Sequence, residues 1–398
     1  MKINENCLKI EQNYLFSEIA QRIKKFQALH PDREVLRLSI NDVTRPLVPA
    51  VVSELTSAAL DMGQYKTFHG YGEEQGETFL REAIARYYRQ HNVSIEPEDI
   101  FVGDGAKNDL GNLCDLFAQD NVVLLQNPVY PVYYDTNMMS GRKIIFLKGT
   151  KENGFLPMPD EKIHADLIYL CSPNNPTGAV YTRGQLYQWV EYAHNHHACI
   201  IYDAAYEAYV RSPALPRSIY EIAGAETCAI EINSLSKMAG FTGVRCGWTI
   251  VPRELMQGNI SLHKLWQRRQ TTKYNGTSYI VQRGAAAVFT AEGQRQIHED
   301  IDYYMQNADI IKDALHANGI WSTGGLHAPY VWVQCPNKMK SWDCFDKLLE
   351  HYGIAGSPGI GFGSGGESWL RFSSFGKRED ICKAAKILAN LDWNRLKT

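Results

Sequence analysis

No stretch of this sequence is apolar for long enough to cross a membrane. Its uninterrupted apolar runs fall well short of the ~18 residues that a membrane span requires. The first thirty residues are polar and carry charges of both signs, so they contain no apolar core of signal-peptide length. Low-complexity tracts and internal repeats are absent as well. We therefore expect a cytoplasmic protein with no membrane partner.

A strong charge of one sign is also missing. The 398 residues include 41 Lys and Arg against 44 Asp and Glu, which gives a net charge of −3. Such a balance offers no basic field for a nucleic acid, so we expect no nucleic-acid partner. The chain is 44% hydrophobic and 21% charged, as is usual for a globular protein, and its length allows about two or three domain units.

The nine cysteines form no C-x-x-C pair and no spacing typical of a zinc site or a disulfide framework. Several of them, such as Cys199 and Cys228, lie inside apolar runs, and we interpret all nine as reduced core thiols. His194, His196 and His197 lie close together in the sequence. They end a predicted surface helix, where cations suit the helix dipole, and no carboxylate motif accompanies them. No metal site is expected.

What the sequence does contain is an alternation of strands and helices in its middle part. Apolar runs at 122–126, 165–171, 198–202 and 228–232 predict buried strands. Between the second and the third, Leu186, Trp189, Val190 and Ala193 recur with helical spacing. Apolar strands between amphipathic helices indicate an α/β fold with a parallel sheet covered on both faces. Ligands of such sheets bind beyond the carboxyl ends of the strands.

The final third has a different pattern. A long helix is predicted over 293–317, followed by short strands at 331–333 and 369–372 and helices near 342–351 and 378–391. This pattern indicates a smaller α+β domain. We expect residues 1–45 to form an arm that packs with it, residues 46–290 to form the large domain, and residues 291–398 to form the small one.

Three chemically useful residues follow three of the predicted strands: Asn175, Asp203 and Lys237. Lys237 lies in Asn233-Ser-Leu-Ser-Lys237, and Arg245 follows eight residues later. A lysine can form a Schiff base with an aldehyde, and an arginine can hold a phosphate. Pyridoxal 5'-phosphate carries both groups, so the sequence indicates this cofactor and makes Lys237 the catalytic residue. Lys237 needs a neutral amine for part of such a cycle, so its pKa must fall through burial or a nearby cation.

Asp203 ends an apolar strand, and a buried carboxylate needs a partner. One interpretation is an ion pair with a structural arginine. The other is a pair with the protonated pyridine nitrogen of the cofactor, which keeps the ring able to absorb electrons. We expect Tyr206, three residues later, to hydrogen-bond the ring's phenolic oxygen. Asn175 is expected to reach the same oxygen from the neighbouring strand. Tyr130 follows a strand in Asn127-Pro-Val-Tyr-Pro131, a place that suits stacking on the ring as well as plain core packing.

The phosphate needs several donors. Asp104-Gly-Ala-Lys107 opens a helical pattern, so the free N–H groups at Ala106 and Lys107 favour an anion there. An ordinary helix start remains the alternative. A helix end contributes only ~0.3–1 kcal/mol, so the side chains of Ser234, Ser236 and Arg245 are expected to supply much of the binding.

Two other segments match known motifs, but the sequence around each does not support the function of the motif. Gly361-Phe-Gly-Ser-Gly-Gly366 matches G-x-G-x-x-G, but a predicted strand follows it where a dinucleotide site needs a helix. Ser234-Leu-Ser-Lys237 matches the S-x-x-K of serine acyl-enzymes, but the accompanying K-T-G and S-D-N segments are missing.

With these residues in place, the chain resembles the fold-type I pyridoxal-phosphate aminotransferases and, among them, those that act on LL-diaminopimelate. The resemblance runs from Asn13-Tyr14 to Arg378-Glu379. Its most specific motifs are Asp42-Val-Thr-Arg-Pro46, Gly70-Tyr-Gly-Glu-Glu-Gln-Gly76, Asp104-Gly-Ala-Lys107, Tyr274-Asn-Gly276, Ala328-Pro-Tyr330 and Arg371-Phe-Ser-Ser-Phe-Gly376.

The resemblance implies a mainly parallel seven-stranded sheet between helices, a smaller α+β domain, and a homodimer with composite active sites. It implies that Tyr71 and Asn275 contact cofactor or substrate, with Tyr71 reaching across from the partner subunit. It implies that Arg371 grips the substrate α-carboxylate. The substrate-binding residues that it implies are Tyr14, Asn41, Glu74, Lys107, Tyr130, Asn175, Asn275 and Arg371. Tyr14, Lys107 and a partner's Glu74 are expected near the distal ammonium and carboxylate of the substrate.

The chain departs from the pattern at two positions, where many relatives have Gly in place of Asn41 and Arg in place of His69. These departures bear on the choice of substrate. The expected reaction is amino transfer between LL-2,6-diaminopimelate and 2-oxoglutarate. The alternatives are an aminotransferase for aspartate, glutamate or an aromatic amino acid, a pyridoxal-phosphate lyase on the same fold, and a non-enzymatic regulator that binds the cofactor.

Overall fold

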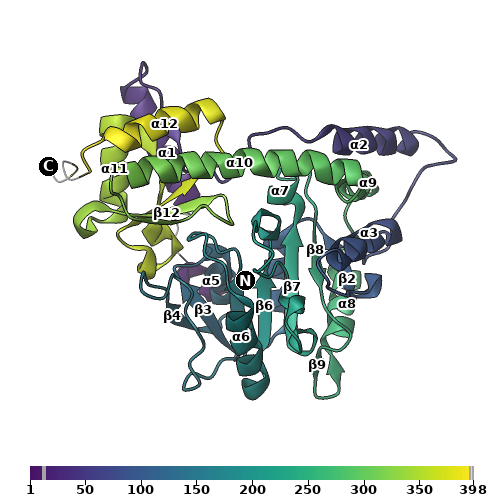
Figure 1. The fold of residues 1–398 in the computed structure, drawn as a ribbon. Helices are drawn as coiled ribbons and strands as arrows, with labels where there is room; N and C mark the ends of the chain where they lie inside the picture. Colours follow the sequence, from purple (N-terminus) through teal and green to yellow (C-terminus); the bar gives the residue numbers. More distant parts are fainter. Residues whose placement is uncertain (11–14, 394–395, 397–398) are drawn as a thin grey trace.

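The computed structural model describes residues 1–10, 15–393 and 396, and its ribbon is divided into a large and a small part (Figure 1). The large part is built around a seven-stranded sheet in the order β2-β8-β7-β6-β5-β3-β4. These strands are β2 (Ile100–Gly103), β3 (Val122–Asn127), β4 (Lys143–Lys148), β5 (Leu167–Cys171), β6 (Cys199–Asp203), β7 (Ala229–Ser234) and β8 (Gly247–Ile250). Only β8 runs antiparallel to its neighbours, so the predicted fold class is confirmed.

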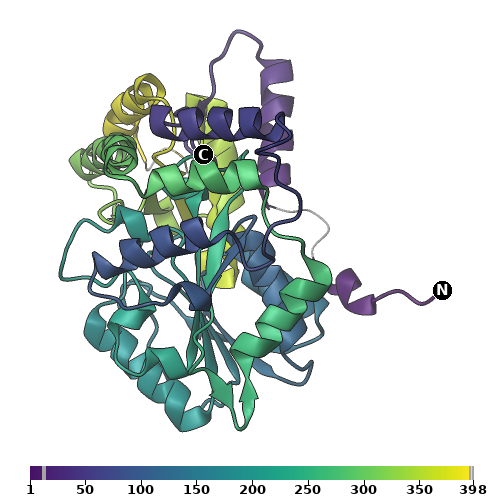
Figure 2. The ribbon, with the colours of Figure 1, turned by 90° about the vertical axis from the view of Figure 1, so that its right-hand side faces the viewer.

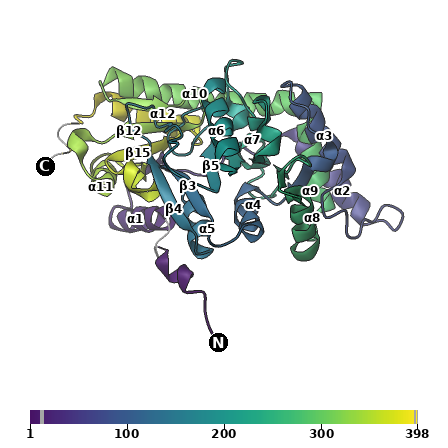
Figure 3. The same cartoon turned by 90° about the horizontal axis from the view of Figure 1, so that it is seen from below.

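The apolar runs of the central strands are buried on both faces because helices cover both sides. Val123 and Leu125 of β3 pack toward α4 (Ala106–Asn112), α5 (Pro131–Met139) and α8 (Leu262–Lys273). Leu124, between them, packs toward α6 (Arg183–His196) on the opposite face. α3 (Thr78–Arg89) covers the β2–β8 end of the sheet. Figure 3 shows α5, α4 and α8 along one side of the strands.

The long predicted helix is present as α10 (Ala291–Ala317). It runs above the sheet from the small part to α2 (Pro49–Met62) and α9 (Tyr279–Val288), as Figure 1 shows. The small part contains an antiparallel sheet in the order β11-β12-β15-β14, flanked by α11 (Ser341–Tyr352) and α12 (Arg378–Asn390). Its strands are β11 (Ser322–Gly324), β12 (Tyr330–Gln334), β14 (Ser357–Pro358) and β15 (Trp369–Ser373).

The N-terminal segment shares the core of this small part. α1 (Leu15–Leu29) buries Ile19, Ile23 and Phe26 in the same cluster as α11 and α12. β1 (Leu36–Arg37) pairs in parallel with β13 (Ile354–Ala355). The short helix at Glu5–Lys9 lies apart from this core near the N-terminus, which projects from the body in Figure 2. The domain boundaries at 45/46 and 290/291 stay predictions.

The glycine-rich segment 361–366 forms a joint between the two parts. Asn127, at the end of β3, donates from Nδ2 to Ser364 Oγ at 2.9 Å, and its Oδ1 accepts from the Gly365 N–H at 2.8 Å. A Cβ on Gly363 would lie 2.5 Å from Asn127 Oδ1, so the close approach requires glycine. β15 follows this segment, as predicted, and the glycines serve chain packing there.

All nine cysteines are free, and six are buried: Cys171, Cys199, Cys228, Cys246, Cys335 and Cys344. The prediction of core thiols is wrong for Cys7, which is exposed because it lies in the short N-terminal helix outside the core. Cys114 and Cys382 are only partly buried. In the described ranges, no helix has the length and apolarity of a membrane span, and no group of three or more His, Cys, Asp or Glu residues is arranged to hold a metal.

Candidate active site

A cavity of about 460 Å³ opens at the carboxyl ends of β5, β6 and β7, beside the start of α4. The parallel strands deliver their following residues to this one edge, as expected for an α/β sheet. Most of the predicted site residues line it: Asn41, Ala106, Lys107, Tyr130, Asn175, Asp203, Tyr206, Ser234, Ser236, Lys237 and Arg245. Segments as far apart in the sequence as Asn41 and Arg245 therefore meet in one cavity.

Asp203 is the last residue of β6, and its carboxylate is buried at the cavity wall. Tyr133 Oη donates to Oδ2 at 2.6 Å, and the Ala205 N–H donates to Oδ1 at 3.0 Å. Burial raises the pKa of Asp203, and the Tyr133 hydrogen bond opposes that rise. Among the described residues no cation pairs with this carboxylate, so the predicted alternative of an ion pair with a structural arginine is wrong. The group is therefore positioned to meet a cation in the cavity.

Lys237 belongs to the short helix α7 (Leu235–Met238), directly after β7. Its Nζ donates to the backbone oxygen of Asn41. Burial lowers the pKa of Lys237 to about 8, the nearby Asp42 raises it, and Arg371 and Arg245 lower it further. The predicted fall in pKa is thus present, and its main cause is burial.

One end of the cavity gathers hydroxyl and guanidinium donors. Ser234 caps α7, and Arg245 Nη1 donates to Ser236 Oγ at 3.2 Å. Arg245 adopts φ 71°, a backbone conformation that favours glycine, and strain of this kind concentrates at functional sites. A Cβ on Gly105, the residue before α4, would lie 2.3 Å from Arg245 Nη2. The absence of a side chain at Gly105 thus lets the arginine lie beside the start of α4, where free N–H groups favour an anion.

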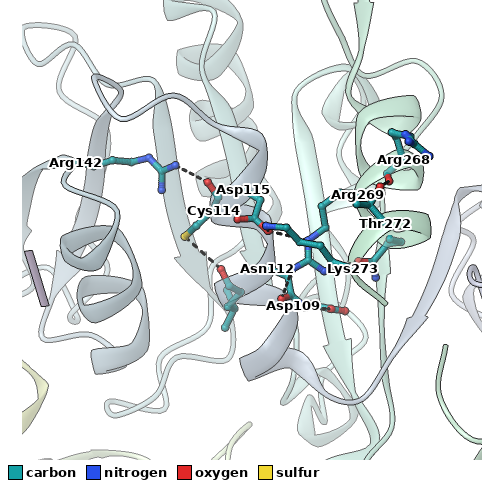
Figure 4. A network of polar contacts seen from close by, with 11 residues as sticks. Asp109, Asn112, Cys114, Asp115, Arg142, Arg268, Arg269, Thr272 and Lys273 are labelled. Carbon is teal, nitrogen blue, oxygen red and sulfur yellow. Dashed lines mark hydrogen bonds and ion pairs between the residues drawn. The ribbon is translucent and has the colours of Figure 1, made fainter. Parts of the chain in front are cut away.

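Polar contacts hold α4 and the turn after it in place, and Figure 4 shows those around Asn112 and Asp115. Asp109 is buried and accepts a hydrogen bond from Thr249 Oγ1 of β8 at 2.7 Å, and burial raises its pKa to about 6. Arg269 of α8 donates to Asn112 Oδ1 at 2.6 Å and to Asp115 Oδ2 at 3.0 Å. These contacts tie the middle of α4 to the sheet, and the end of α4 and the turn after it to α8.

Arg371 approaches the cavity from β15 of the small part and is fully buried. Its Nη1 donates to Asn175 Oδ1 at 2.7 Å, and its guanidinium lies 4.3 Å from the ring centroid of Tyr330. Arg371 Nε has no hydrogen-bond acceptor in the part of the chain that the structure describes. A buried guanidinium with a spare donor suits an anionic ligand group.

Asn41 and two tyrosines form a hydrogen-bond chain along the wall. Tyr206 Oη lies 2.7 Å from Tyr330 Oη, which donates to Asn41 Oδ1 at 3.2 Å. Asn41 is absent from the residues of positive φ, so its backbone needs none of the freedom of a glycine. His69, the other departure from the family pattern, is exposed outside the cavity, and its ring stacks on Tyr279.

Three predicted residues that the structure describes are not brought into this cavity. Tyr71 is 90% exposed, and Glu74 and Asn275 are exposed as well. The turn at Gly276 packs against the backbone of Glu73, so the two segments lie side by side. Tyr14 lies outside the described residues.

Sequence reasoning missed several residues of the cavity, among them Asp42, Tyr133 and Thr242, and it missed Tyr330 beside it. Tyr133 follows Tyr130 by three residues at the start of α5, so helical spacing puts the two side chains on the same face. This spacing is the sequence signal that points to Tyr133 as a site residue. The role of Tyr330 depends on contacts with Asn41 and Tyr206, which are far away in the sequence.

The chain is similar to known proteins over nearly its whole length. Residues 33–388 match the family described as aminotransferase class I and II. The chain is 51% identical to the LL-diaminopimelate aminotransferase of Lawsonia intracellularis, over 96% of this chain and 97% of that protein. It is 47% identical to the LL-diaminopimelate aminotransferase of Bacteroides fragilis, over 98% and 99%. The solved structure of the L,L-diaminopimelate aminotransferase from Chlamydomonas reinhardtii superposes with a TM-score of 0.91 at 40% identity, covering 97% of both chains.

The lowered pKa of Lys237 gives a testable pH dependence in the protein freed of any cofactor. Only the neutral amine reacts with dinitrofluorobenzene, so the rate of Lys237 labelling should rise with a midpoint near pH 8. Asp42→Asn should move this midpoint lower, because Asp42 favours the charged form. Peptide mass spectrometry at each pH measures both. A midpoint above pH 10, or an upward shift in the variant, would contradict this account of the site.

Proposed function

Because the chain belongs to the family of class I and II aminotransferases, we propose that it exchanges an amino group between LL-2,6-diaminopimelate and 2-oxoglutarate. In the biosynthetic direction the substrates are tetrahydrodipicolinate and glutamate, and the product serves the synthesis of lysine and peptidoglycan. We propose pyridoxal 5'-phosphate as the cofactor and a cytoplasmic homodimer as the assembly. The observation that carries the proposal is that one cavity holds both Lys237, whose pKa is lowered, and the buried carboxylate of Asp203, which pairs with no cation among the described residues.

The donor set of the cavity fits this cofactor. Ser234, Ser236 and Arg245, with the N–H groups at the start of α4, would hold the phosphate. Asp203 would face the ring nitrogen, since a buried carboxylate is stabilised by a cation. Tyr130 lines the same cavity and offers an aromatic face to the ring.

Pyridoxal phosphate, when bound, supplies an aldehyde that condenses with amines and a ring that accepts the electrons of a breaking Cα–H bond. Burial lowers the pKa of Lys237 to about 8, so its amine loses its proton more readily than an ordinary lysine and is suited to take the proton from the substrate Cα. Asp203, oriented by Tyr133, would hold a proton on the ring nitrogen.

Asn175 links substrate and cofactor recognition. Its Oδ1 is occupied by Arg371, so its Nδ2 remains to donate to the ring's phenolic oxygen, which the hydroxyl of Tyr206 would also face. Arg371 offers a planar guanidinium to the substrate α-carboxylate, and a lysine cannot copy that bidentate geometry. Lys107 and Asn41, which line the cavity, would lie toward the distal end of the substrate.

The exposed segment after α2 supports a composite site. Tyr71 and Glu74 are exposed to solvent in the single chain, and the segment of Asn275 lies beside theirs. Large apolar side chains are exposed on and after α2, namely Val52, Leu60, Tyr65, Phe68 and Tyr71. An exposed apolar patch of this kind marks an interaction surface. We propose that a second copy covers it and receives Tyr71, Glu74 and Asn275 in its own cavity.

The substrate is tested with purified protein loaded with pyridoxal phosphate, a panel of amino donors and detection of glutamate formed from 2-oxoglutarate. LL-diaminopimelate should give the highest kcat/KM, because a site that binds a polar group can reject analogues without it by up to roughly 10⁴–10⁵. Lys237→Ala, assayed in parallel, controls for contaminating enzymes. A higher kcat/KM for aspartate, glutamate or an aromatic amino acid would replace the proposed substrate. Loss of a substituent without glutamate formation would indicate a lyase.

The composite site is tested by mixing two inactive variants, Lys237→Ala and Tyr71→Ala. After unfolding and refolding together in equal amounts, about half of the dimers are mixed, and each mixed dimer has one site with both residues intact. Activity should return to roughly a quarter of the wild-type value, above the residual activity of Tyr71→Ala alone. Mixed dimers that are detected by mass spectrometry but stay inactive would mean that each subunit builds its site alone.

A further inference from the structure

The side chains of Asn41 and Tyr206, which both line the cavity, are the two ends of a hydrogen-bond chain. Asn41 Oδ1 accepts from Tyr330 Oη at 3.2 Å, and Tyr330 Oη lies 2.7 Å from Tyr206 Oη. Both tyrosines are buried, so water does not compete for these contacts. The backbone oxygen of Asn41 also accepts a hydrogen bond from Lys237 Nζ. Residue 41 therefore contacts both Lys237 and the tyrosine chain.

Each phenol has a single proton, and this fixes the direction of the chain. An amide oxygen only accepts, so Tyr330 gives its proton to Asn41, and Tyr206 must then give its own proton to Tyr330. In this direction Tyr206 presents only lone pairs to the cavity. If the amide turns to present Nδ2, Tyr330 accepts from Asn41 and donates to Tyr206. Tyr206 is then free to donate its proton into the cavity.

We propose that Asn41 is a positioning residue whose amide sets the direction of the Asn41–Tyr330–Tyr206 chain, and with it whether Tyr206 donates to the ring oxygen of the cofactor. This inference rests on the proposed function. A donor to that oxygen withdraws electron density from it, so the lysine-bound cofactor loses its own proton more easily. Asn41 thereby tunes the pH at which the Lys237–cofactor linkage deprotonates, and its side chain does so through Tyr330 and Tyr206.

Other charges act on the same linkage and must be separated from this effect. Asp42 favours the protonated form of Lys237, whereas Arg371, Arg245 and Lys107 oppose it. Arg371 also lies 4.3 Å from the ring centroid of Tyr330. These groups stay in place when the side chain at position 41 is changed, so a comparison of variants at that position holds their contribution nearly constant.

The test is a pH titration of the visible absorbance of the lysine-bound cofactor in the holoenzyme. Asn41→Asp keeps the size of the side chain but only accepts, so it holds the chain in the direction away from the cavity. Asn41→Ala removes the acceptor and leaves Tyr330 free to donate to Tyr206. The midpoint should be higher in Asn41→Asp than in Asn41→Ala by about one pH unit or more, a tenfold change in proton affinity.

The added charge of Asn41→Asp raises the midpoint by itself, so both variants are repeated together with Tyr206→Phe, which cuts the chain. In a double-mutant cycle the part carried by hydrogen bonds disappears and the part caused by charge remains. The difference between the two position-41 variants should therefore shrink with Tyr206→Phe. An equal difference with and without Tyr206→Phe would overturn the inference.

A second break in the chain guards against a variant that folds poorly. Tyr330→Phe keeps the ring beside Arg371 and removes only the hydroxyl, so its midpoint should match that of Asn41→Ala. A midpoint as high as that of Asn41→Asp would contradict the proposal. If the wild type shows no visible absorbance band with pyridoxal phosphate, the proposed function itself fails, which distinguishes that failure from failure of the role of Asn41.

Discussion

The buried carboxylate of Asp203 is the constraint around which this cavity is organised. It is buried at the end of a central strand, and among the described residues it accepts hydrogen bonds from Tyr133 Oη and the Ala205 N–H alone. Such a group is expensive to bury without a cation, and the described residues provide none beside it. A ligand that brings a protonated nitrogen to this place would stabilise the carboxylate. The parallel sheet makes the arrangement possible, because its strand order puts the ends of β5, β6 and β7 next to each other.

The remaining charges are arranged so that Lys237 stays partly neutral. Burial lowers its pKa, Arg371 and Arg245 add to this effect, and Asp42 limits it. The same two arginines are held by separate parts of the fold. Arg245 lies against Gly105 at the start of α4, and Arg371 comes from β15 of the small part. The packing of the small part against the sheet, through Asn127 and the 361–366 segment, therefore bears on the electrostatics of the cavity.

The sequence predicts much of the fold and the centre of the site because local patterns determine them. Apolar strands between amphipathic helices predict the parallel sheet, and Asp203 and Lys237 each stand at the end of such a strand. Tyr330 was not predicted because its contacts with Asn41 and Tyr206 cross long sequence separations. Tyr133 contacts Asp203, 70 positions away, and its spacing from Tyr130 is the local signal that points to it. The glycine-rich segment is understood only through its contact with Asn127. Cys7 is exposed because its short helix lies outside the core, which composition does not reveal.

The central claim is that Lys237 carries a pyridoxal cofactor in this cavity. It is tested most directly by incubating the protein with pyridoxal phosphate, reducing with borohydride, which makes the lysine–cofactor bond permanent, and mapping the labelled peptide by mass spectrometry. The account predicts a single label on Lys237, with none on Lys107, the other lysine that lines the cavity. A label on Lys107 or on any other lysine, with Lys237 unmodified, would contradict it.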